Sequence, residues 1–356
     1  MKKIILTGGG TAGHVTPHLA LLPLLKAEGF EVHYIGSRDG MEKELVEAAG
    51  IPYHGISAGK LRRYMHVKNI TDVFRVIRGF GNAFGIIRRI QPNIIFSKGG
   101  FVTVPVLAAA RVLRVKSVSH ESDLTPGLAN RISGPFTNKI CVSFPETLAH
   151  LPTNKGVLTG SPIRKELLQG DREKGLELCQ WSDGGKPVII ITGGSLGAAA
   201  INNAVREVLP QLLSKYRVIH LCGKGNLAET EYPGYVQFEY VRDELANLYA
   251  LADIAVSRAG ANTLFELLAM KKPNLLIPLP QESSRGDQIL NAESFALQGF
   301  SKILPEGKIT NERLLNAIDL LYNDRKIYKN NMATHEQNDG VTRVMNVIND
   351  VLNNQP

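Results

Sequence analysis

Short, continuously apolar runs rich in β-branched residues recur along the chain and alternate with helical patterns. A first series reads KIILT, VHYIG, NIIFS, KSVSH and KICVS, and after residue 160 a second series reads PVIIIT, RVIHLCG, YVQFEYV, DIAVS and NLLIP. Strands that are apolar throughout and separated by helices are typical of parallel sheets covered on both faces. Two such series in 356 residues predict two doubly wound α/β domains.

The join between the two series lies near NKGVLTGSPIRKEL, where turn residues separate the apolar runs. We expect Rossmann-like domains over residues 1–161 and 162–336. A last helical pattern, VTRVMNVINDVLNN, follows both predicted sheets, and we expect segment 337–356 to pack back on the first domain. Ligands of such folds bind at the carboxyl ends of the strands, so with two domains we expect the site in a cleft that both face.

Glycine-rich loops follow several of the predicted strands. They are TGGGTAGH (7–14), SKGGF (97–101) and TGGSLGA (192–198), and a fourth loop, SRAGANTLFE (257–266), also leads into a helix. Glycine lets exposed backbone N–H groups approach an anion, and a helix N-terminus adds a partial positive charge. The two loops of the second domain therefore predict a phosphate-bearing ligand.

The first loop also satisfies G-x-G-x-x-G over residues 8–13, which is the pattern of dinucleotide-binding folds. A nicotinamide dehydrogenase would carry an acid for the ribose at the end of the second strand, where this chain has Gly36 and Ser37. Asp39 comes a few residues too late. A dehydrogenase is thus the weaker interpretation, and a scaffold without catalytic activity at a membrane surface is a third.

His14 follows the first glycine loop at the expected entrance of a helix, where the helix dipole favours the neutral imidazole. A neutral histidine that faces a cleft can take a proton from a hydroxyl group. The alternative is a histidine that caps the helix or packs in the core. His14 is therefore a candidate general base.

Polar side chains of the second domain suit a nucleotide sugar. The Ser195 hydroxyl can donate to a phosphate oxygen beside the amides of Leu196 and Gly197, and Thr263 can do the same from the first turn of its helix. Glu266, three residues further on, lies on the same helix face and suits the two hydroxyls of a ribose. The alternative for Glu266 is an ordinary first-turn acid.

The loop QESSRGDQILNAE (281–293) is polar, rich in turn residues and leads into a helix. Asp287 and Gln288 can bind sugar hydroxyls, or they can simply cap that helix. The cysteines Cys141, Cys179 and Cys222 are scattered and odd in number, which predicts buried thiols and no metal site.

Positive charge is concentrated in the first part of the chain. Residues 1–160 hold 20 Lys and Arg against 10 Asp and Glu, a net charge of +10, whereas the remaining residues hold 21 against 23. This asymmetry predicts that the first domain meets a negatively charged surface or polymer. No run of about 18 apolar residues occurs, and the apolar start is too short for a signal peptide, so we expect an intracellular protein without a membrane-spanning helix.

The stretch 59–92 combines an apolar stripe at helical spacing with basic flanks. The stripe contains Ile70, Val73, Phe74, Ile77, Phe80, Phe84 and Ile87, and the flanks contain Lys60, Arg62, Arg63, Lys68, Arg75, Arg78, Arg88 and Arg89. Such a pattern is typical of helices at an anionic membrane surface, but a crossover helix that buries its stripe on the sheet has it too. Both interpretations hold if the N-terminal part packs inward and the tip is exposed. No aromatic stacking array accompanies the charge, so we expect no nucleic acid partner.

Seven motifs occur in order along nearly the whole chain: GGGTAGHVTPHLAL, SKGGFVTVP, HESDLTPGLANR, GSPIR, TGGSLGA, SRAGANTLFEL and RGDQILNAE. In these motifs the chain resembles the MurG family of N-acetylglucosaminyltransferases, in glycosyltransferase family 28. The resemblance implies the two-domain GT-B fold. It also implies inverting transfer of N-acetylglucosamine from UDP-N-acetylglucosamine to lipid I, giving lipid II for peptidoglycan, with neither a cofactor nor an essential metal.

The same resemblance implies a place in the cell and a set of partners. The acceptor, undecaprenyl-diphospho-MurNAc-pentapeptide, is held in the membrane, which implies a peripheral enzyme on the cytoplasmic face of the cell membrane. Proteins of cell-wall synthesis and division are possible partners. Related enzymes that remain as alternatives are another glycosyltransferase with a lipid acceptor and a UDP-sugar 2-epimerase.

The family's site residues map onto matching positions of this chain. Positions implied to contact substrate are Thr11, Ala12, Gly13, Asp123, Arg164, Ser195, Val241, Ala261, Asn262, Thr263, Leu264, Phe265, Glu266 and Gln288. For the general base His14 is our first choice, and Glu121 is the second. The chain departs from the family's pattern at Ala12, often glycine, at Phe101, a tyrosine in some members, at Asp123, an asparagine in many members, and at Asp287, a glutamine.

Overall fold

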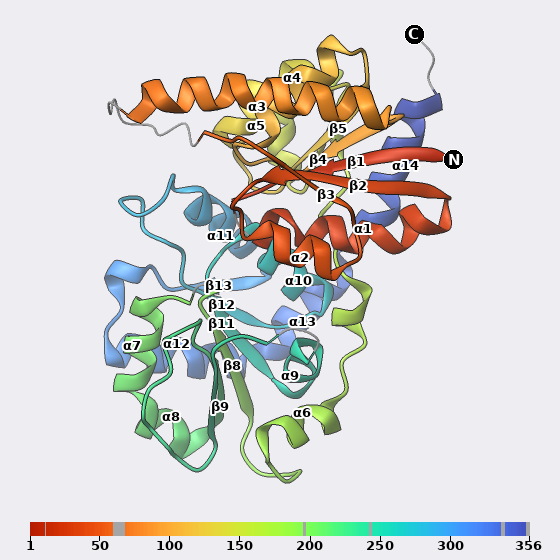
Figure 1. The fold of residues 1–356 in the computed structure, drawn as a ribbon. Helices are drawn as coiled ribbons and strands as arrows, with labels where there is room; N and C mark the ends of the chain where they lie inside the picture. The colour runs from red at the N-terminus through yellow and green to blue at the C-terminus, as the bar shows by residue number, and fades with distance from the viewer. Residues whose placement is uncertain (11, 60–67, 195–196, 242–243, 336–338, 354–356) are drawn as a thin grey trace. The chain divides into compact units, whose positions relative to one another are not determined.

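The computed structural model describes residues 1–10, 12–59, 68–194, 197–241, 244–335 and 339–353 (Figure 1). The chain forms two compact units. Unit 1 comprises Met1–Arg164 together with Asn338–Pro356, and unit 2 comprises Lys165–Gln337. Chain continuity therefore places the crossing from unit 1 to unit 2 at the end of the GSPIR motif.

Unit 1 is built on a seven-stranded, fully parallel sheet of described residues. Its strands are β1 (Lys2–Thr7), β2 (Phe30–Ser37), β3 (Tyr53–Ile56), β4 (Ile94–Ser97), β5 (Lys116–Glu121), β6 (Lys139–Val142) and β7 (Gly156–Leu158), in the order β3-β2-β1-β4-β5-β6-β7. The order reverses beside β1, because β2 pairs on one side and β4 on the other. The loops that leave β1, β4 and β5 therefore meet at this switch point, where doubly wound folds bind ligands.

Helices cover both faces of this sheet (Figure 1). Because side chains alternate along a strand, Ile4 and Leu6 pack against α1 (Thr16–Ala27) and α14 (Gly340–Asn353), whereas Ile5 packs with α3 (Lys68–Ile90) and α4 (Thr103–Val112). Shorter helical segments are α2 (Glu42–Ala48), α5 (Leu128–Ser133) and the 3₁₀ turns η1 (Ala12–His14), η2 (Gly134–Phe136) and η3 (Pro145–His150).

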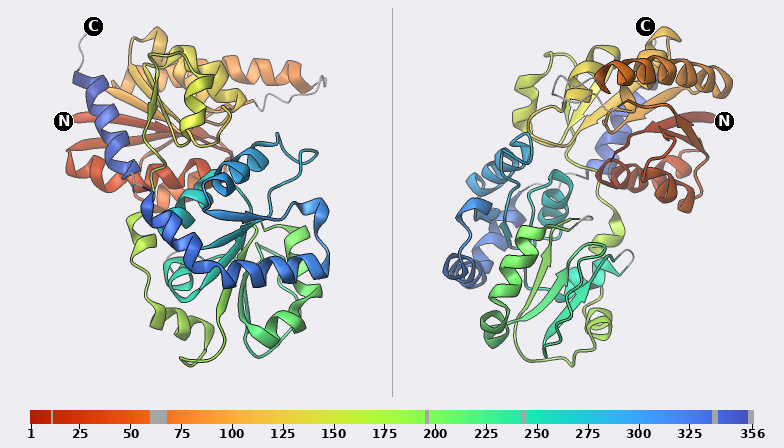
Figure 2. Two further views of the ribbon diagram at one scale, coloured as in Figure 1. Left: turned by 180° about the vertical axis from the view of Figure 1, so that it is seen from behind. Right: turned by 60° about the vertical axis from the view of Figure 1, so that its left-hand side comes forward.

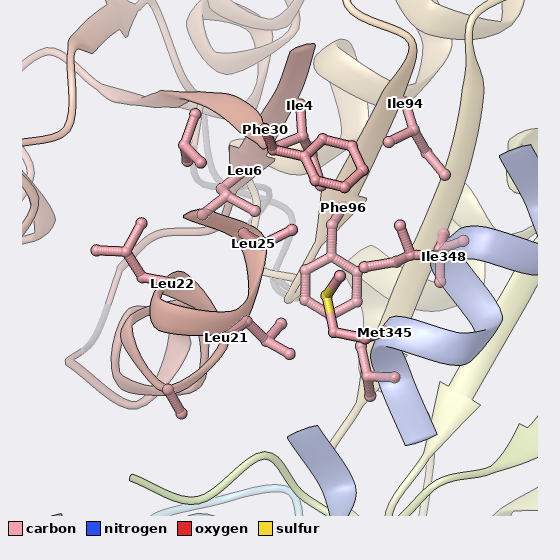
Figure 3. Close-up of a cluster of buried hydrophobic side chains, with 14 of the residues drawn as sticks. Ile4, Leu6, Leu21, Leu22, Leu25, Phe30, Ile94, Phe96, Met345 and Ile348 are labelled. Atoms are coloured by element: carbon pink, nitrogen blue, oxygen red, sulfur yellow. The ribbon is translucent and has the colours of Figure 1, made fainter. Parts of the chain in front are cut away.

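The last helix, α14, belongs to the core of unit 1. Met345 and Ile348 point into a cluster that contains Phe96 of β4 and Leu21 of α1 (Figure 3). Figure 2 shows α14 beside α1 and the strands of this sheet. Full burial of one such side chain contributes about 1.5–3 kcal/mol. The C-terminal segment is thus a structural part of unit 1.

Unit 2 contains a six-stranded parallel sheet in its described part. The strands are β8 (Val188–Thr192), β9 (Arg217–Leu221), β10 (Tyr235–Phe238), β11 (Ile254–Ser257), β12 (Asn274–Leu276) and β13 (Ser301–Ile303), in the order β10-β9-β8-β11-β12-β13. The order reverses beside β8, which pairs with β9 and β11. The loops after β8 and β11 thus meet at the switch point of this sheet.

Helices surround the second sheet as well. They are α6 (Arg172–Cys179), α7 (Ala199–Glu207), α8 (Leu209–Lys215), α9 (Leu245–Leu251), α10 (Ala261–Ala269), α11 (Asp287–Leu297), α12 (Asn311–Asn323) and α13 (Arg325–Thr334), with 3₁₀ turns η4 (Lys165–Leu168) and η5 (Glu306–Lys308). Ile189 and Ile191 of β8 are fully buried in a cluster with side chains of α7, α8 and α12. The prediction of two doubly wound parallel sheets is confirmed.

Three strands were not predicted: β3, β7 and β13. Each lies at an edge of its sheet and has only three or four residues. Most residues of these three strands are only partly buried, so their sequences lack the continuous apolar run by which the central strands are recognised. The three cysteines are free and buried, as expected.

The helix predicted over the basic stretch is α3, but its burial runs opposite to our expectation. Among its described side chains, Phe74 and Ile77 near the beginning are 68% and 61% exposed, whereas Ala83, Ile87 and Ile90 towards the end are buried. The later turns lie against α4 in the core, and the earlier turns extend beyond that contact. The expectation that the N-terminal part packs inward is therefore wrong for the described residues. Residues 60–67 and the side chains of 68–73 lie outside the description.

Candidate functional site

Two glycine loops of unit 1 touch backbone to backbone at the switch point. Gly100, after β4, has φ of +88°, and a Cβ atom there would lie 2.3 Å from the Gly9 carbonyl oxygen of the loop after β1. No side chain fits this space, and L-residues rarely adopt this φ. Glycine at this position therefore lets the two loops approach each other closely.

His14 ends the turn η1 that also holds Ala12 and Gly13, and it is half-buried. Its Nδ1 atom lies 3.1 Å from the Lys98 carbonyl oxygen, in the second glycine loop. A carbonyl group can only accept, so Nδ1 carries the hydrogen and Nε2 of the neutral ring keeps its lone pair. In this tautomer Nε2 is the basic nitrogen of the ring. Thr11 lies outside the described residues.

Glu121, the second candidate base, ends β5 and is 5% exposed. Its Oε1 accepts from the Asp123 backbone N–H at 3.1 Å, and its Oε2 accepts at 2.8 Å from both the Gly127 N–H and Asn130 Nδ2. The carboxylate therefore holds the loop between β5 and α5. Three donors already occupy the oxygen atoms that a general base would need for a substrate proton.

Asp123 lies in this loop, and both its backbone N–H and its backbone carbonyl group are hydrogen-bonded. Its N–H donates to Glu121, and its carbonyl oxygen accepts from Thr147 Oγ1 at 3.3 Å. The side chain is half-buried. Residue 123 is thus presented on a rigid backbone, which is what a substrate contact requires.

Beneath these loops lies a buried polar cluster that the sequence did not predict. Lys98, 1% exposed, donates to His120 Nδ1 at 2.6 Å and to Ser122 Oγ, and His120 Nε2 lies 2.9 Å from the Gly160 carbonyl oxygen. The one available signal was a lysine directly after an apolar strand, within SKGGF. That pattern is equally typical of an exposed lysine.

Glu42 is another buried carboxylate of unit 1. Unlike Glu121, it was not predicted as a site residue from the sequence. It is fully buried in α2, and it accepts at 2.8 Å from the N–H and at 2.6 Å from the hydroxyl of Ser37, at the end of β2. Gly10 N lies 3.5 Å from its other oxygen. A dehydrogenase would place a ribose at the end of β2, but here Ser37 is bound to a carboxylate of the chain itself.

In unit 2, the loops after β8 and β9 are also in backbone contact. Gly197 has φ of +76°, and a Cβ atom there would lie 2.1 Å from the Cys222 carbonyl oxygen. The same oxygen accepts from Asn202 Nδ2 at 2.9 Å, and Gly194 N donates to Thr192 Oγ1 at 3.2 Å. These bonds fix the flanks of the predicted phosphate loop. Ser195 and Leu196 themselves lie outside the described residues.

Helix α10 begins directly after the loop that follows β11. Gly260 caps it, and a Cβ atom there would meet no other atom within 4 Å. The first N–H groups of an α-helix have no acceptor within the helix itself, which makes this end a candidate anion site. Ala261 and Leu264 are buried, and the Phe265 ring packs edge-on against Phe295 with ring centroids 5.4 Å apart. Ala261 and Leu264 can therefore reach a ligand only through their backbone, whereas Phe265 is half-buried.

Asn262, Thr263 and Glu266 are the half-buried polar residues of the first turns of α10. Burial, with the charge of Glu266 adding to it, raises the pKa of the Tyr249 hydroxyl. Glu266 lies three residues after Thr263, on the same face of α10.

The remaining predicted site residues lie in loops or at helix ends. Gln288 Oε1 accepts from the Leu279 N–H at 3.1 Å, which leaves the Gln288 NH₂ group to donate, and Asp287 is paired with Arg285 at 3.2 Å. Arg164 is half-buried, and its Nε has no hydrogen-bond partner among the described residues. Val241, also half-buried, lies beyond β10 next to undescribed residues. The described residues contain no group of three or more His, Cys, Asp or Glu placed to hold a metal ion.

Comparison with known proteins decides the family. Residues 4–142 match the glycosyltransferase family 28 N-terminal domain, and residues 188–346 match the glycosyltransferase family 28 C-terminal domain. A protein of Clostridium novyi, a UDP-N-acetylglucosamine–N-acetylmuramyl-(pentapeptide) pyrophosphoryl-undecaprenol N-acetylglucosamine transferase, is 54% identical over 97% of this chain and 98% of its own length. The chain belongs to glycosyltransferase family 28. It is a glycosyltransferase, which decides against the dehydrogenase interpretation.

Further relatives agree with this membership. Proteins with the same name from Lachnospira eligens and Clostridium tetani are 55% and 52% identical, and each alignment covers 98% of this chain and 97% or more of the relative. The crystal structure of Acinetobacter baumannii MurG superimposes with a TM-score of 0.76 at 24% identity, covering 98% of this chain and all of that one. The resemblance to the MurG family is thus confirmed. A UDP-GlcNAc 2-epimerase from Methanocaldococcus jannaschii, 12% identical with a TM-score of 0.66 over 98% of this chain and all of that one, shares the fold.

Among the described residues, no helix of this family 28 member is both long and apolar enough to cross a membrane.

Proposed function

We propose that this chain transfers N-acetylglucosamine from UDP-N-acetylglucosamine to the 4-hydroxyl of the muramoyl sugar of lipid I, giving lipid II. The observation that carries this proposal is the identity of 52–55% to transferases named for this reaction, over 97–99% of the chain.

Unit 2 binds the donor in this proposal. The first N–H groups of α10 and the loop around Gly197 supply backbone donors for the diphosphate. Ser195, which lies outside the described residues, adds a hydroxyl donor according to the sequence. Glu266 accepts hydrogen bonds from the ribose hydroxyls. The free NH₂ group of Gln288 donates to a hydroxyl of the sugar, because its carbonyl oxygen is already engaged by Leu279.

Unit 1 binds the acceptor and removes its proton. The acceptor hydroxyl attacks the anomeric carbon from the face opposite UDP, so that configuration inverts. As the new carbon–oxygen bond forms and the bond to the diphosphate breaks, the hydroxyl proton passes to His14 Nε2 and the electron pair leaves on UDP. Helix and loop amides, together with Arg164, stabilise the charge that collects on UDP. Glu121 acts as a positioning residue, since its oxygens are bound to loop donors.

The exposed turn of α3 over residues 74–78 docks unit 1 on the membrane in this proposal. Phe74 and Ile77 are apolar and exposed, and Arg75 and Arg78 beside them are exposed as well. Apolar side chains that enter the interface, with cations close to anionic headgroups, are the pattern of peripheral binding. A lipid-linked acceptor and a soluble nucleotide sugar then place the enzyme on the cytoplasmic face of the membrane. Cell-wall synthesis and division proteins are candidate partners there.

The proposal is tested by incubating the purified chain with radiolabelled UDP-N-acetylglucosamine and a lipid I analogue, with and without a chelator. We expect a disaccharide lipid with a β-linkage and a rate that the chelator does not change. Radiolabel in an epimerised sugar without acceptor would instead identify a UDP-sugar 2-epimerase, and transfer to another lipid alone would identify a different acceptor.

A further inference from the structure

Lys98 is hydrogen-bonded to three different elements of unit 1. Its backbone N–H donates at 2.9 Å to the carbonyl oxygen of Thr7, the last residue of β1. Its ammonium donates at 2.6 Å to Nδ1 of His120 on β5, and to Ser122 Oγ directly after that strand. Its carbonyl oxygen lies 3.1 Å from His14 Nδ1 at the end of η1. One residue therefore joins two central strands to the candidate base.

The carbonyl group that accepts from His14 is followed by two glycines. It belongs to the peptide group between Lys98 and Gly99, so its direction depends on ψ of Lys98 and φ of Gly99. Gly99 and Gly100 both have φ of +88°. Glycine has more conformational freedom than any other residue and brings no side chain that could hold the loop. The side chain that can fix the direction of this peptide group is therefore that of Lys98.

The Lys98 side chain is anchored by directional hydrogen bonds inside the protein. Lys98 is 1% exposed, and His120 is fully buried. His120 Nε2 lies 2.9 Å from the Gly160 carbonyl oxygen, which can only accept, so Nε2 carries the hydrogen and Nδ1 accepts from the ammonium. Burial keeps the pKa of His120 well below its ordinary value, so this acceptor persists near neutral pH. Water does not compete for these bonds, because the exposed surface of both side chains is negligible.

We propose that Lys98 is a positioning residue for His14, because its buried ammonium anchors the peptide group whose carbonyl oxygen accepts from His14 Nδ1. This inference rests on the proposed function, in which His14 is the general base. The bond to the carbonyl oxygen selects the tautomer with its lone pair on Nε2. It also stabilises the imidazolium that forms when Nε2 takes the proton of the acceptor hydroxyl. Lys98 thus acts on catalysis through His14, without touching the substrate.

The test compares Lys98→Met with the parent by NMR of isotope-labelled histidine rings, without substrate. Methionine keeps a long side chain but removes the donors that anchor the loop. The signals of His14 are identified by their absence in His14→Ala. In the parent we expect the hydrogen of neutral His14 on Nδ1, and in Lys98→Met a mixture of the two tautomers. An unchanged tautomer in Lys98→Met would overturn the proposal.

Steady-state kinetics of the same variant separates positioning of the base from binding. We expect Lys98→Met to lower kcat about tenfold or more, because a base that is displaced by a fraction of an ångström loses much of its effect. The KM for UDP-N-acetylglucosamine should change less than about twofold, since the donor binds to unit 2 in the proposed function. An unchanged kcat would likewise contradict the role of Lys98.

Lys272→Met is the matched control, because Lys272 is also a buried lysine, but it donates to the Ala252 carbonyl group within unit 2. Both lysine variants should lower Tm by several degrees, because buried acceptors lose their donor. Only Lys98→Met should change the His14 tautomer. Equal changes of the tautomer in both variants would mean that general destabilisation is the cause.

Ser122→Ala provides the test if Lys98→Met does not fold. It removes one acceptor of the ammonium, and we expect a smaller shift of the His14 tautomer in the same direction; no shift would overturn the proposal. The NMR measurement needs no transfer activity. A tautomer shift in a parent that does not transfer the sugar would refute the proposed function and leave the anchoring of His14 by Lys98. Transfer by the parent without any tautomer shift in the variants would refute only the role of Lys98.

Discussion

The glycine loops of the two units follow strands at equivalent positions in the two sheets. The buried side chains that hold these loops in place differ. In unit 1 the loops after β1, β4 and β5 rest on buried ionisable side chains, namely Glu42, Lys98, His120 and Glu121. In unit 2 the loop after β9 is held by the amide of Asn202, which also bonds His220. Burial lowers the pKa of His220 to about 4, so this support is uncharged near neutral pH.

The difference matches two kinds of chemistry. Backbone amides with neutral supports keep a fixed positive field for a diphosphate, whose charge does not vary near pH 7. Proton transfer instead needs a titratable group held in one tautomer, and in unit 1 the Lys98 carbonyl holds His14 in this way. In the proposed function, the same doubly wound topology therefore serves anion binding in one unit and acid–base chemistry in the other.

Removal of the candidate base should have the largest effect. We expect His14→Ala to lower kcat by about 10²–10⁴-fold, because the acceptor hydroxyl loses its proton acceptor, with donor KM unchanged. His150 is the matched control, since it is an exposed histidine of the same unit, and His150→Ala should leave kcat unchanged. Steady-state kinetics with the lipid I analogue measures both. A loss below tenfold for His14→Ala would mean that another group is the base.

A substitution in the glycine loop of unit 2 should lower the stability of the protein and weaken nucleotide binding. Gly197→Ala places a methyl group against the Cys222 carbonyl at a φ that alanine disfavours, and we expect it to lower the free energy of unfolding by about 3 kcal/mol and to weaken UDP binding. Gly225→Ala is the control, because Gly225 has a similar φ of +75° but a Cβ atom there would meet nothing within 4 Å. Its loss of stability therefore measures the backbone strain without the steric clash. Chemical denaturation and calorimetry with UDP provide the measurements. Equal losses for both variants would mean that the collision is unimportant.

A smaller effect distinguishes the two candidate roles of Glu121. In Glu121→Gln the new NH₂ group faces an N–H donor of the loop, so we expect a loss of about 1–3 kcal/mol of stability and a higher acceptor KM. As a positioning residue, Glu121 should leave the shape of the kcat–pH profile unchanged in this variant. Disappearance of the rising limb of that profile would instead identify Glu121 as the base.

The smallest effect is expected at the beginning of α3. Arg75→Gln and Arg78→Gln should each weaken binding to anionic vesicles by about 1 kcal/mol, and Phe74→Ser should weaken it further. Leu297→Ser removes an apolar side chain of unit 2 that is 89% exposed, and it should not change vesicle binding. Sedimentation with phosphatidylglycerol vesicles at two salt concentrations measures this. Equal binding by all of these variants would place membrane contact on another surface.

Central strands, the edge strand β10 and the glycine loops could be predicted, whereas three short edge strands and the buried side chains that hold the loops could not. The strands β1, β4, β8 and β11 are apolar throughout because helices cover both faces, and that pattern is local in the sequence. Strands β3, β7 and β13 are short edge strands without it. Helix α3 shows the same limit, since its stripe predicts an apolar face but not which turns of the helix find a partner.

By itself the sequence determined the two parallel α/β folds and the positions of the glycine loops, and it predicted His14 as the candidate base. These follow from periodicity and from glycine, which act over a few residues. Only the tertiary structure decided that Glu42 and Lys98 are buried and that Glu121 holds a loop. The partners of these side chains come from other strands and helices, and the cost of burying a charge depends on what the fold brings next to it.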